Sequence, residues 1–383
     1  MFFLQHGHGK SNKIEEVAAT GYLGGVILSP GSEDAPALSA TVARCRQLGT
    51  RVLMDPQSFI YATNPQGSAR FHERHGLDLT DMSWAAPASS LVRHLRLVRS
   101  ANINVGLERE FIAPAPYNAN LIDYWVPTSL QYARTAADEW RGTSVLATLA
   151  VDESAFDDWA RVSDWLDALT TLDLTGFYLI VNRTGQPYPP IGWEARRLAN
   201  LLRTIYTLSV LNEYEVLWGY SDLDGILGTA VGADGVAAGW SYGLRQFSIR
   251  RYNETRAGGA QPVPRLYIRA LMSDIRNNEI NDILQTEYGR QLLEPELRGL
   301  RPDTLTNPAA QVQHLRALAT EVGELESLVD YRDRIDLVQS RIGIALDHFS
   351  RLAETGLALE GRYVNRLRSY SEAIDAFRSD VSL

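Results

Sequence analysis

The sequence contains one cysteine, two lysines and no long apolar run. A single cysteine, Cys45, excludes an intrachain disulfide and a zinc site built from several cysteines. No apolar stretch reaches the roughly 18 to 20 residues that a membrane-spanning helix needs, so we expect a soluble protein. The first ten residues, MFFLQHGHGK, show no long apolar region followed by a small-residue cleavage site. We therefore expect a cytoplasmic protein without a signal peptide.

Acidic residues outnumber basic ones, 46 to 37, and the formal net charge at pH 7 is −9. This balance argues against a broad surface for nucleic acid, although it leaves room for a local basic channel. A nucleic-acid ligand would therefore need a confined basic site.

Short apolar runs alternate with helix-like stretches from residue 1 to about residue 250. The runs are Phe2–Leu4, Val26–Leu28, Val52–Met54, a looser one within Ile103–Ala113, Val145–Val151, Phe177–Val181, Val216–Trp218 and Val236–Ala238. Continuous apolar strands that alternate with helices are typical of a parallel sheet covered on both faces. About eight such units in about 250 residues is the size of a (β/α)8 barrel. The sequence therefore predicts an α/β fold of the TIM-barrel type, with its active site where the strands end.

Three segments depart from this alternation. A polar insertion runs from about 58 to 84, and insertions of this length after a strand are usually lids or partner-binding loops. A Gly/Pro linker at 253–264 separates the barrel, residues 1–252, from residues 265–383. The last region has amphipathic helical patterning and no chemical motif. We expect an all-helical extension that packs against the barrel or against another subunit.

The first strand ends in two histidines, His6 and His8. Their H-x-H spacing places them on one side of an extended segment, as in metal-dependent hydrolases built on this barrel. Such hydrolases also need histidines from later strands, and no later strand end carries one. A two-histidine site completed by Asp55 or Asp222 is one interpretation. Structural or hydrogen-bonding histidines are the favoured one, so we predict no metal site.

The third strand ends in Asp55, the strongest candidate for a catalytic acid or base. A carboxylate beside the low-dielectric mouth of a barrel can have a raised pKa. The alternative is an aspartate that caps the turn begun by Pro56. Other strand ends offer side chains for ligand binding, the arginines for an anionic group and the aromatic rings for stacking. These are Gln57, Asn182, Arg183, Tyr220, Trp240, Tyr242 and Arg245.

Two stretches, RVLMDPQSFIY and LWGYSDLDGILGTAVGADGVAAGWSYGLRQFS, resemble the barrel of tRNA-guanine transglycosylases and of their relatives that insert deazaguanine bases into DNA. The resemblance implies that Asp55 corresponds to the aspartate that acts on the base. The last strand of that family carries a nucleophilic aspartate, whereas Val236, Ala237 and Ala238 stand here, and the zinc-binding cysteines of the family are absent. The resemblance thus implies a related barrel that binds a nucleotide or nucleic acid without the covalent aspartate mechanism.

Three hypotheses for function follow. The first is a transglycosylase-like barrel that binds a nucleotide, nucleobase or nucleic acid at its mouth, with Asp55 as acid or base and His6 and His8 as hydrogen-bonding groups, in nucleic-acid modification or phage defence. The second is a non-catalytic subunit that associates with itself or with another protein through the helical extension. The third is a metal-dependent hydrolase that uses the two histidines. The sequence identifies no cofactor, predicts no membrane partner, and leaves open whether the chain is an enzyme.

Overall fold

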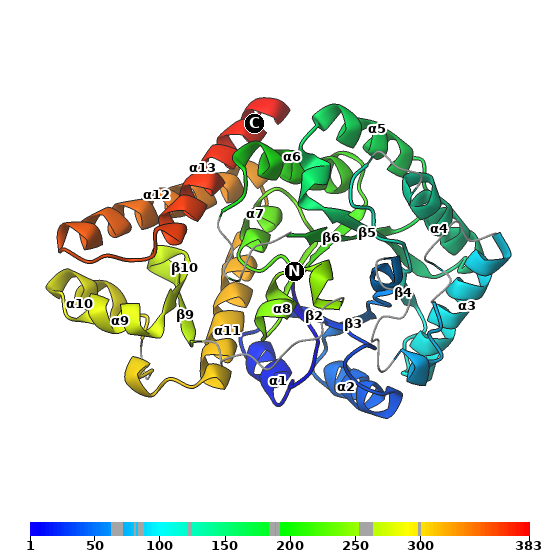
Figure 1. Ribbon diagram of the computed structural model, residues 1–383, viewed down its shortest axis with the longest axis horizontal. Helices are drawn as coiled ribbons and strands as arrows, with labels where there is room; N and C mark the ends of the chain where they lie inside the picture. Colours follow the sequence, from blue (N-terminus) through cyan, green and yellow to red (C-terminus); the bar gives the residue numbers. More distant parts are fainter. Residues whose placement is uncertain are drawn as a thin grey trace.

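The computed structural model describes residues 1–62, 72–79, 82, 88–121, 125–183, 188, 192–252, 263–297 and 300–383. Within them, eight parallel strands form one sheet that curls into a barrel (Figure 1). The strands are β1 (Phe2–Gln5), β2 (Leu23–Leu28), β3 (Arg51–Met54), β4 (Glu110–Ala113), β5 (Ser144–Asp152), β6 (Gly176–Asn182), β7 (Glu215–Gly219) and β8 (Gly235–Ala238). They pair in the order β3-β2-β1-β8-β7-β6-β5-β4. The predicted TIM-type barrel is confirmed.

Helices follow the strands and cover the outside of the sheet. They are α1 (Lys13–Ala18), α2 (Ala35–Gln47), α3 (Ala88–Asn104), α4 (Trp125–Glu139), α5 (Trp159–Leu169), α6 (Ala195–Tyr206), α7 (Asp224–Ala230) and α8 (Tyr242–Arg245). Each apolar run of the sequence coincides with all or part of a strand. The looser fourth run holds only β4, because α3 extends to Asn104 and ends before Gly106, whose φ of +94° suits glycine.

The barrel interior is filled by side chains. Phe3 and Gln5 lie on the same side of β1 because side chains alternate along a strand. Phe3 is fully buried, and Gly25 in β2 and Gly235 in β8 leave room for its ring: a Cβ on either would lie within 3 Å of that ring. The glycines on the two strands that flank β1 therefore leave space for the Phe3 ring inside the barrel.

The strands β3 and β4 lie at the two ends of the pairing order, and side chains bridge the seam between them. Arg51, at the start of β3, pairs with Glu110 of β4 at 2.7 Å and also forms an ion pair with Glu215 of β7. At the other end of the seam, the Ser58 hydroxyl donates to the carbonyl oxygen of Ala115 and accepts from its N–H, both at 2.9 Å. Polar side chains thus hold the barrel together where strand pairing stops.

The extension begins with a hairpin and continues with helices. Its elements are β9 (Arg265–Ile268), β10 (Ser273–Arg276), α9 (Asn277–Leu284), α10 (Glu287–Leu293), α11 (Asn307–Glu326), α12 (Tyr331–Glu354) and α13 (Gly361–Val381). The prediction of an all-helical extension is wrong for residues 265–276, where β9 and β10 pair antiparallel and pack apolar side chains on α11. The turn between them ends in Met272 with a φ of +43°, a conformation that its sequence does not signal.

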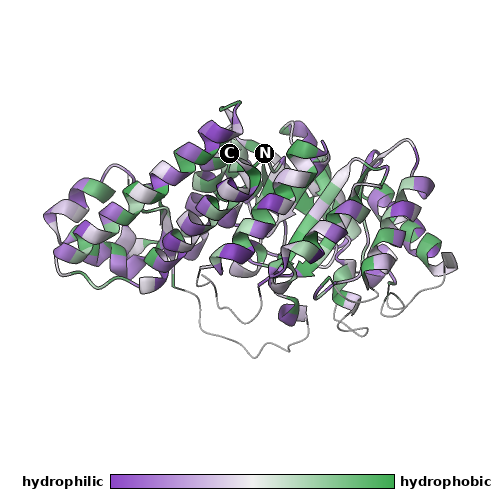
Figure 2. Ribbon diagram, turned by 90° about the horizontal axis from the view of Figure 1, so that it is seen from above, coloured by the Kyte–Doolittle hydropathy of each residue, from purple (hydrophilic) through white to green (hydrophobic). Residues whose placement is uncertain are grey.

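The extension completes the barrel wall. Helix α8 has only four residues and cannot cover β8 and β1 as the other helices cover their strands. Helix α11 lies there instead, against α1, α7 and β1, while α13 packs on α6 (Figure 1). Seen from above, the extension helices carry alternating polar and apolar residues along their length (Figure 2). No helix in the described part of the chain has the length and apolarity to cross a membrane.

The predicted insertion and linker are described only in part. Within 58–84, the structure gives two short 3-10 helices, η1 (Ser58–Ala62) and η2 (Glu73–His75). Residues 63–71, 80–81 and 83–84 of the insertion and 253–262 of the linker lie outside the described residues.

Candidate functional site

Asp55 follows β3 directly and is fully buried at the end of the barrel where the strands finish. Its Oδ1 accepts a hydrogen bond from the backbone N–H of Gln57 at 2.8 Å. Gln57 has a φ of +51°, which folds the chain back over the carboxyl group. Asp55 therefore caps this turn, as the alternative interpretation of the sequence proposed. The capping role leaves its second oxygen free to face the barrel interior.

A hydrogen-bonded chain joins Asp55 to the first strand. The hydroxyl of Tyr178, in the middle of β6, lies 3.2 Å from Asp55 Oδ2 and 3.3 Å from Gln5 Oε1. A hydroxyl carries one proton and can donate to only one of these oxygens at a time. Both contacts are satisfied when a protonated Asp55 donates to Tyr178 and Tyr178 donates to Gln5. The ionised carboxylate instead accepts from Tyr178, which leaves the Gln5 oxygen without that donor.

Burial raises the pKa of Asp55 to about 7, and the hydrogen bonds from Gln57 and Tyr178 offset only part of this effect. Desolvation penalises the carboxylate because the barrel interior replaces water with a medium of lower dielectric. Burial also raises the pKa of Tyr178 well above its usual range, so that its hydroxyl keeps its proton. Asp55 is thus a carboxyl group that can give or take a proton near neutral pH.

Aromatic side chains cover Asp55 and Gln57. We call Phe59, Tyr220, Phe247 and Tyr252 the aromatic cap. The ring of Phe247 lies 5.0 Å from that of Phe59, 5.5 Å from that of Tyr220 and 6.3 Å from that of Tyr252, between centroids. The Gln57 amide lies beneath the cap, its Nε2 at 3.5 Å from the hydroxyls of Tyr220 and Tyr252. The site is closed to water in this conformation.

Gln57 also connects the cap to the second strand. Its Oε1 accepts from the Ser29 hydroxyl at 2.9 Å and from the Gly31 N–H at 3.3 Å. The amide oxygen is therefore held by two hydrogen bonds, whereas among the described residues the nitrogen makes only the two long contacts. The sequence-based choice of Gln57 and Tyr220 as residues of one site agrees with their proximity to Asp55.

The two predicted histidines do not face the same way. His6 is fully buried, with the edge of its ring against Trp240 at 5.7 Å between centroids, and His8 is exposed. Neither nitrogen of His6 has a hydrogen-bond partner among the described residues, since Glu33 Oε2 lies 3.5 Å from Nε2 without forming one. Burial lowers the pKa of His6 and keeps the ring neutral. The expected placement on one side is wrong, because the chain leaves the extended conformation after Gln5.

Asn182 and Arg183, at the end of β6, are occupied by partners within the protein. The Asn182 amide donates to the Tyr117 hydroxyl at 2.9 Å and to Asp152 Oδ2 at 2.8 Å. The Arg183 guanidinium pairs with Glu153 at 2.9 Å and Asp224 at 3.3 Å and lies over the Trp193 ring. Two carboxylates already balance its charge, so Arg183 offers little to the predicted anionic ligand.

Arg245 belongs to a buried polar cluster that joins the barrel to the extension. We call Asp222, Asp274, His314 and Tyr188 the interface tetrad. His314 lies between the aspartates, with Nδ1 2.7 Å from Asp274 and Nε2 2.6 Å from Asp222. The Tyr188 hydroxyl lies 2.6 Å from Asp274 Oδ2 and 2.8 Å from Asp222 Oδ2 and donates its one proton to one of them at a time, and Arg245 pairs with Asp274 at 3.1 Å. The cluster connects the end of β7 to β10 and α11.

Three members of the tetrad, Asp222, Asp274 and His314, are the group of possible metal ligands found in the described part of the chain. Each nitrogen of His314 faces a different aspartate, so both ring nitrogens act as donors and one ion cannot bind them together. Burial and Arg245 oppose protonation of His314, but the two aspartates outweigh them and its pKa is raised. The residues fit an imidazolium between two carboxylates better than they fit a metal.

The remaining predicted residues, Trp240 and Tyr242, follow β8. Trp240 is buried and donates from Nε1 to the carbonyl oxygen of His8 at 2.7 Å. The Tyr242 ring stacks on Tyr188 at 4.3 Å between centroids. Both line a hollow of about 340 Å³ beside the barrel mouth, together with Arg245.

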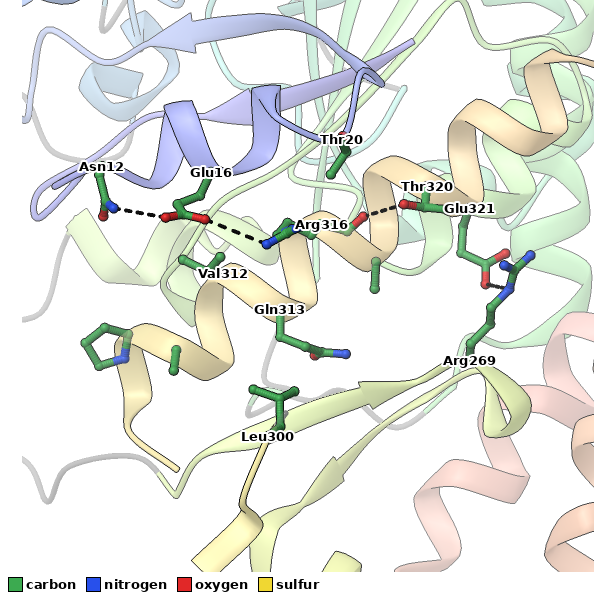
Figure 3. Close-up of a pocket in the computed structure, with 13 residues that line it drawn as sticks. Asn12, Glu16, Thr20, Arg269, Leu300, Val312, Gln313, Arg316, Thr320 and Glu321 are labelled. Atoms are coloured by element: carbon green, nitrogen blue, oxygen red, sulfur yellow. Dashed lines mark hydrogen bonds and ion pairs between the residues drawn. The ribbon is translucent and has the colours of Figure 1, made fainter. Parts of the chain in front are cut away.

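A larger groove of about 830 Å³ lies on the outer wall between α1 and α11 (Figure 3). Its charged side chains pair with one another: Glu16 lies between Asn12 and Arg316, and Arg269 contacts Glu321. None of the strand-end residues lines it. This groove carries no group poised for chemistry, so the barrel mouth remains the candidate site.

Sequence reasoning missed Tyr178 and Gln5 as contributors to the site, and also the cap residues Phe247 and Tyr252. Tyr178 lies inside a continuous apolar run, where a tyrosine looks like any other core residue. A signal for Gln5 was present, because a glutamine that ends an apolar strand is a polar group at the barrel mouth.

The chain matches no protein-family model and no curated protein sequence. A search of solved structures finds a protein assigned as a fructose-1,6-biphosphate aldolase from Coccidioides immitis. The alignment has 10% sequence identity and a TM-score of 0.34, and it covers 86% of this chain and 89% of that one. The similarity is too low to support an argument about activity, and the site must be interpreted from its own residues.

Proposed function

We propose that the barrel mouth binds a nucleobase, either free or as part of a nucleotide or nucleic acid, and that Asp55 exchanges a proton with it. The observation that carries the proposal is the buried Asp55 carboxyl group, with its pKa raised to about 7. Bases present ring N–H groups and ring nitrogens at their edges. A carboxyl group near its pKa can accept from the first and donate to the second.

Unpartnered polar atoms near Asp55 support a ligand with several hydrogen-bonding groups. Gln5 Nε2 and both nitrogens of His6 are buried without a hydrogen-bond partner among the described residues. Buried polar atoms are nearly always paired, so each such atom calls for a partner. Gln5 contacts Tyr178 beside Asp55, whereas the His6 ring packs against Trp240. A base edge bound to Asp55 would therefore lie next to the Gln5 donor.

The aromatic cap supports a planar ligand. Stacking of a base on an aromatic side chain contributes roughly 1 to 3 kcal/mol. In the present conformation the cap closes over Asp55, so a ligand requires movement of Tyr252 or of the Gln57 side chain. Their contact, at 3.5 Å, is long for a hydrogen bond.

The resemblance to transglycosylases enters the proposal only in part. β8 carries Gly235, Val236, Ala237 and Ala238, with no carboxylate to attack a glycosidic carbon. We therefore propose base recognition and proton exchange at Asp55 without a covalent intermediate on this strand.

The alternative hypotheses draw less support from the structure. A hydrolase that uses His6 and His8 is disfavoured because the first ring is buried and the second lies on the surface. An assembly subunit would need a shared apolar surface. The large apolar side chains that are most exposed, Leu211, Val329 and Ile344, lie on different elements.

Calorimetric titration with adenosine, guanosine, cytidine and uridine tests the proposal. At pH 7 we expect at least one nucleoside to bind with 1:1 stoichiometry. Asp55→Asn should weaken this binding by about tenfold or more, the usual cost of losing a hydrogen bond to a charged or protonating partner. The matched control is Asp164→Asn, which changes an exposed carboxylate on α5. Absence of binding by all four nucleosides, or equal affinity of both variants, would contradict the proposal.

A further inference from the structure

The hollow beside the barrel mouth is lined by basic and polar side chains. We call it the arginine pocket and define it by Ser241, Tyr242, Arg245, Arg251, Arg265 and Gln311. Its volume is about 340 Å³, enough for a phosphoryl group and part of the molecule that carries it. No carboxylate is among the described residues that line it. The pocket is therefore a basic site on a chain whose net charge is −9.

One of its three guanidinium groups has no counter-charge among the residues that the structure describes. Arg245 pairs with Asp274 at 3.1 Å, and Arg265 approaches Glu360 at 3.5 Å and donates to the Tyr363 hydroxyl at 3.1 Å. Arg251 forms no ion pair with any described residue, and its Nε is buried without a hydrogen-bond acceptor. A buried, unpaired donor on a charged group is costly, which indicates that an anion completes the pocket.

The backbone is shaped to hold Arg251 in this position. A Cβ at Gly243 would lie 1.8 Å from Arg251 Cζ, so the guanidinium group rests on the bare backbone of Gly243. Any other residue at 243 would push the group away. Arg251 lies in η6 (Ile249–Tyr252), and the next residue, Tyr252, belongs to the aromatic cap over Gln57. The short helix η6 thus contributes Tyr252 to the barrel mouth and Arg251 to the arginine pocket.

We propose that the arginine pocket binds the phosphoryl group of the ligand whose base occupies the barrel mouth. This inference rests on the proposed function, and it narrows the ligand from a base to a phosphorylated nucleoside. The Arg251 guanidinium supplies a planar fork of N–H donors that suits two phosphate oxygens, and the Ser241 hydroxyl and the Gln311 amide supply further donors. The nearby ion pairs of Arg245 and Arg265 keep the wall polar and rigid.

Titration with inorganic phosphate at constant ionic strength tests the pocket separately from the base site. We expect saturable 1:1 binding by the wild type, and about tenfold or greater weakening in Arg251→Gln. Arg250→Gln is the matched control, because it removes the same charge from the neighbouring, exposed arginine. Gly243→Ala keeps every charge and displaces the guanidinium, so it should also weaken binding, even if Arg251→Gln fails to fold. Absence of saturable binding by the wild type, or equal losses in Arg250→Gln and Arg251→Gln, would overturn the inference.

Two comparisons link the pocket to the mouth. The probes are the 5′-monophosphates of adenosine, guanosine, cytidine and uridine. The monophosphate of each nucleoside that binds should bind at least tenfold more tightly than the nucleoside itself, and Arg251→Gln should abolish that difference. Equal affinities in the wild type would overturn the assignment of the pocket to the ligand's own phosphoryl group. Asp55→Asn should leave the affinity for inorganic phosphate unchanged. Failure of the base site with phosphate binding intact would then contradict the proposed function and leave the anion site standing.

Discussion

Replacement of Asp55 by asparagine should make the protein more stable, and the gain should depend on pH. Burial raises the pKa of Asp55 from the ordinary value of 3.8 to about 7. At 1.36 kcal/mol per pH unit, this difference corresponds to about 4 kcal/mol of folding free energy. Asparagine occupies the same volume. It can accept from the Gln57 N–H and donate to the Tyr178 hydroxyl as the protonated acid does.

The direction in which the unfolding free energy changes with pH follows from proton binding by the folded and unfolded states. Between about pH 4 and pH 7 the unfolded chain loses the Asp55 proton while the folded chain keeps it, so the wild type loses stability as the pH rises. Above pH 7 both states are ionised and the loss levels off. Asparagine does not titrate. The difference in unfolding free energy between Asp55→Asn and the wild type should therefore be small near pH 4, grow by about 1.4 kcal/mol per pH unit, and reach about 4 kcal/mol at pH 8.

Urea denaturation of both proteins at a series of pH values between 4.5 and 8.5, on the order of one pH unit apart, measures this difference. Subtracting the unfolding free energy of the wild type from that of the variant cancels the contribution of all other titrating groups. Asp164→Asn, on the surface, should show almost no difference at any pH. A constant difference between Asp55→Asn and the wild type would refute a raised pKa. A variant that is less stable than the wild type at pH 8 would refute the neutral hydrogen-bonded chain.

Three further predictions concern the groups around the site and the barrel. Tyr178→Phe removes a hydrogen bond that lowers the pKa of Asp55, so the midpoint of the Asp55 titration should move above pH 7, and an unmoved midpoint would contradict the contact. His314→Gln should cost about 3 to 5 kcal/mol in urea denaturation at pH 6, because it removes the cation that lies between two buried aspartates and leaves only Arg245 beside Asp274. Since the pKa of His314 is raised, this cost should shrink as the pH rises through that pKa, and a cost that grows with pH would contradict the imidazolium. Arg51→Gln should lower stability by about 2 kcal/mol, since it leaves Glu110 of β4 and Glu215 of β7 without the cation that they share, and a neutral effect would show that the ion pairs do not hold the seam.

The sequence predicted the barrel because the physical cause of its pattern is local. A parallel strand buried on both faces must be apolar throughout, as the FYLIV run of β6 is. The hairpin in the extension was missed because RLYI and SDIR are short and lie next to helical patterning. The turn between them ends in Met272 and has no glycine or asparagine to signal it.

The candidate site was predicted only where strand ends expose polar residues. Asp55 and Gln57 could be found in this way, since the residues after β3 must reach the mouth of the barrel. The contribution of Tyr178 depends on which side of β6 its ring faces, and a continuous apolar run conceals that choice. The pairing of Asp274 with His314 depends on the packing of α11 against the barrel, which no short-range pattern determines.

Infrared difference spectroscopy of protein labelled with ¹³C-aspartate, with Asp55→Asn as the reference, tests the central claim most directly. The account predicts that the band of a protonated Asp55 carboxyl group is present at pH 6 and disappears with a midpoint near 7. It also predicts that the band shifts when the nucleoside found by calorimetry is added, because the base then bonds to this carboxyl group. An Asp55 that is ionised at pH 5, or a band that does not respond to the bound nucleoside, would contradict it.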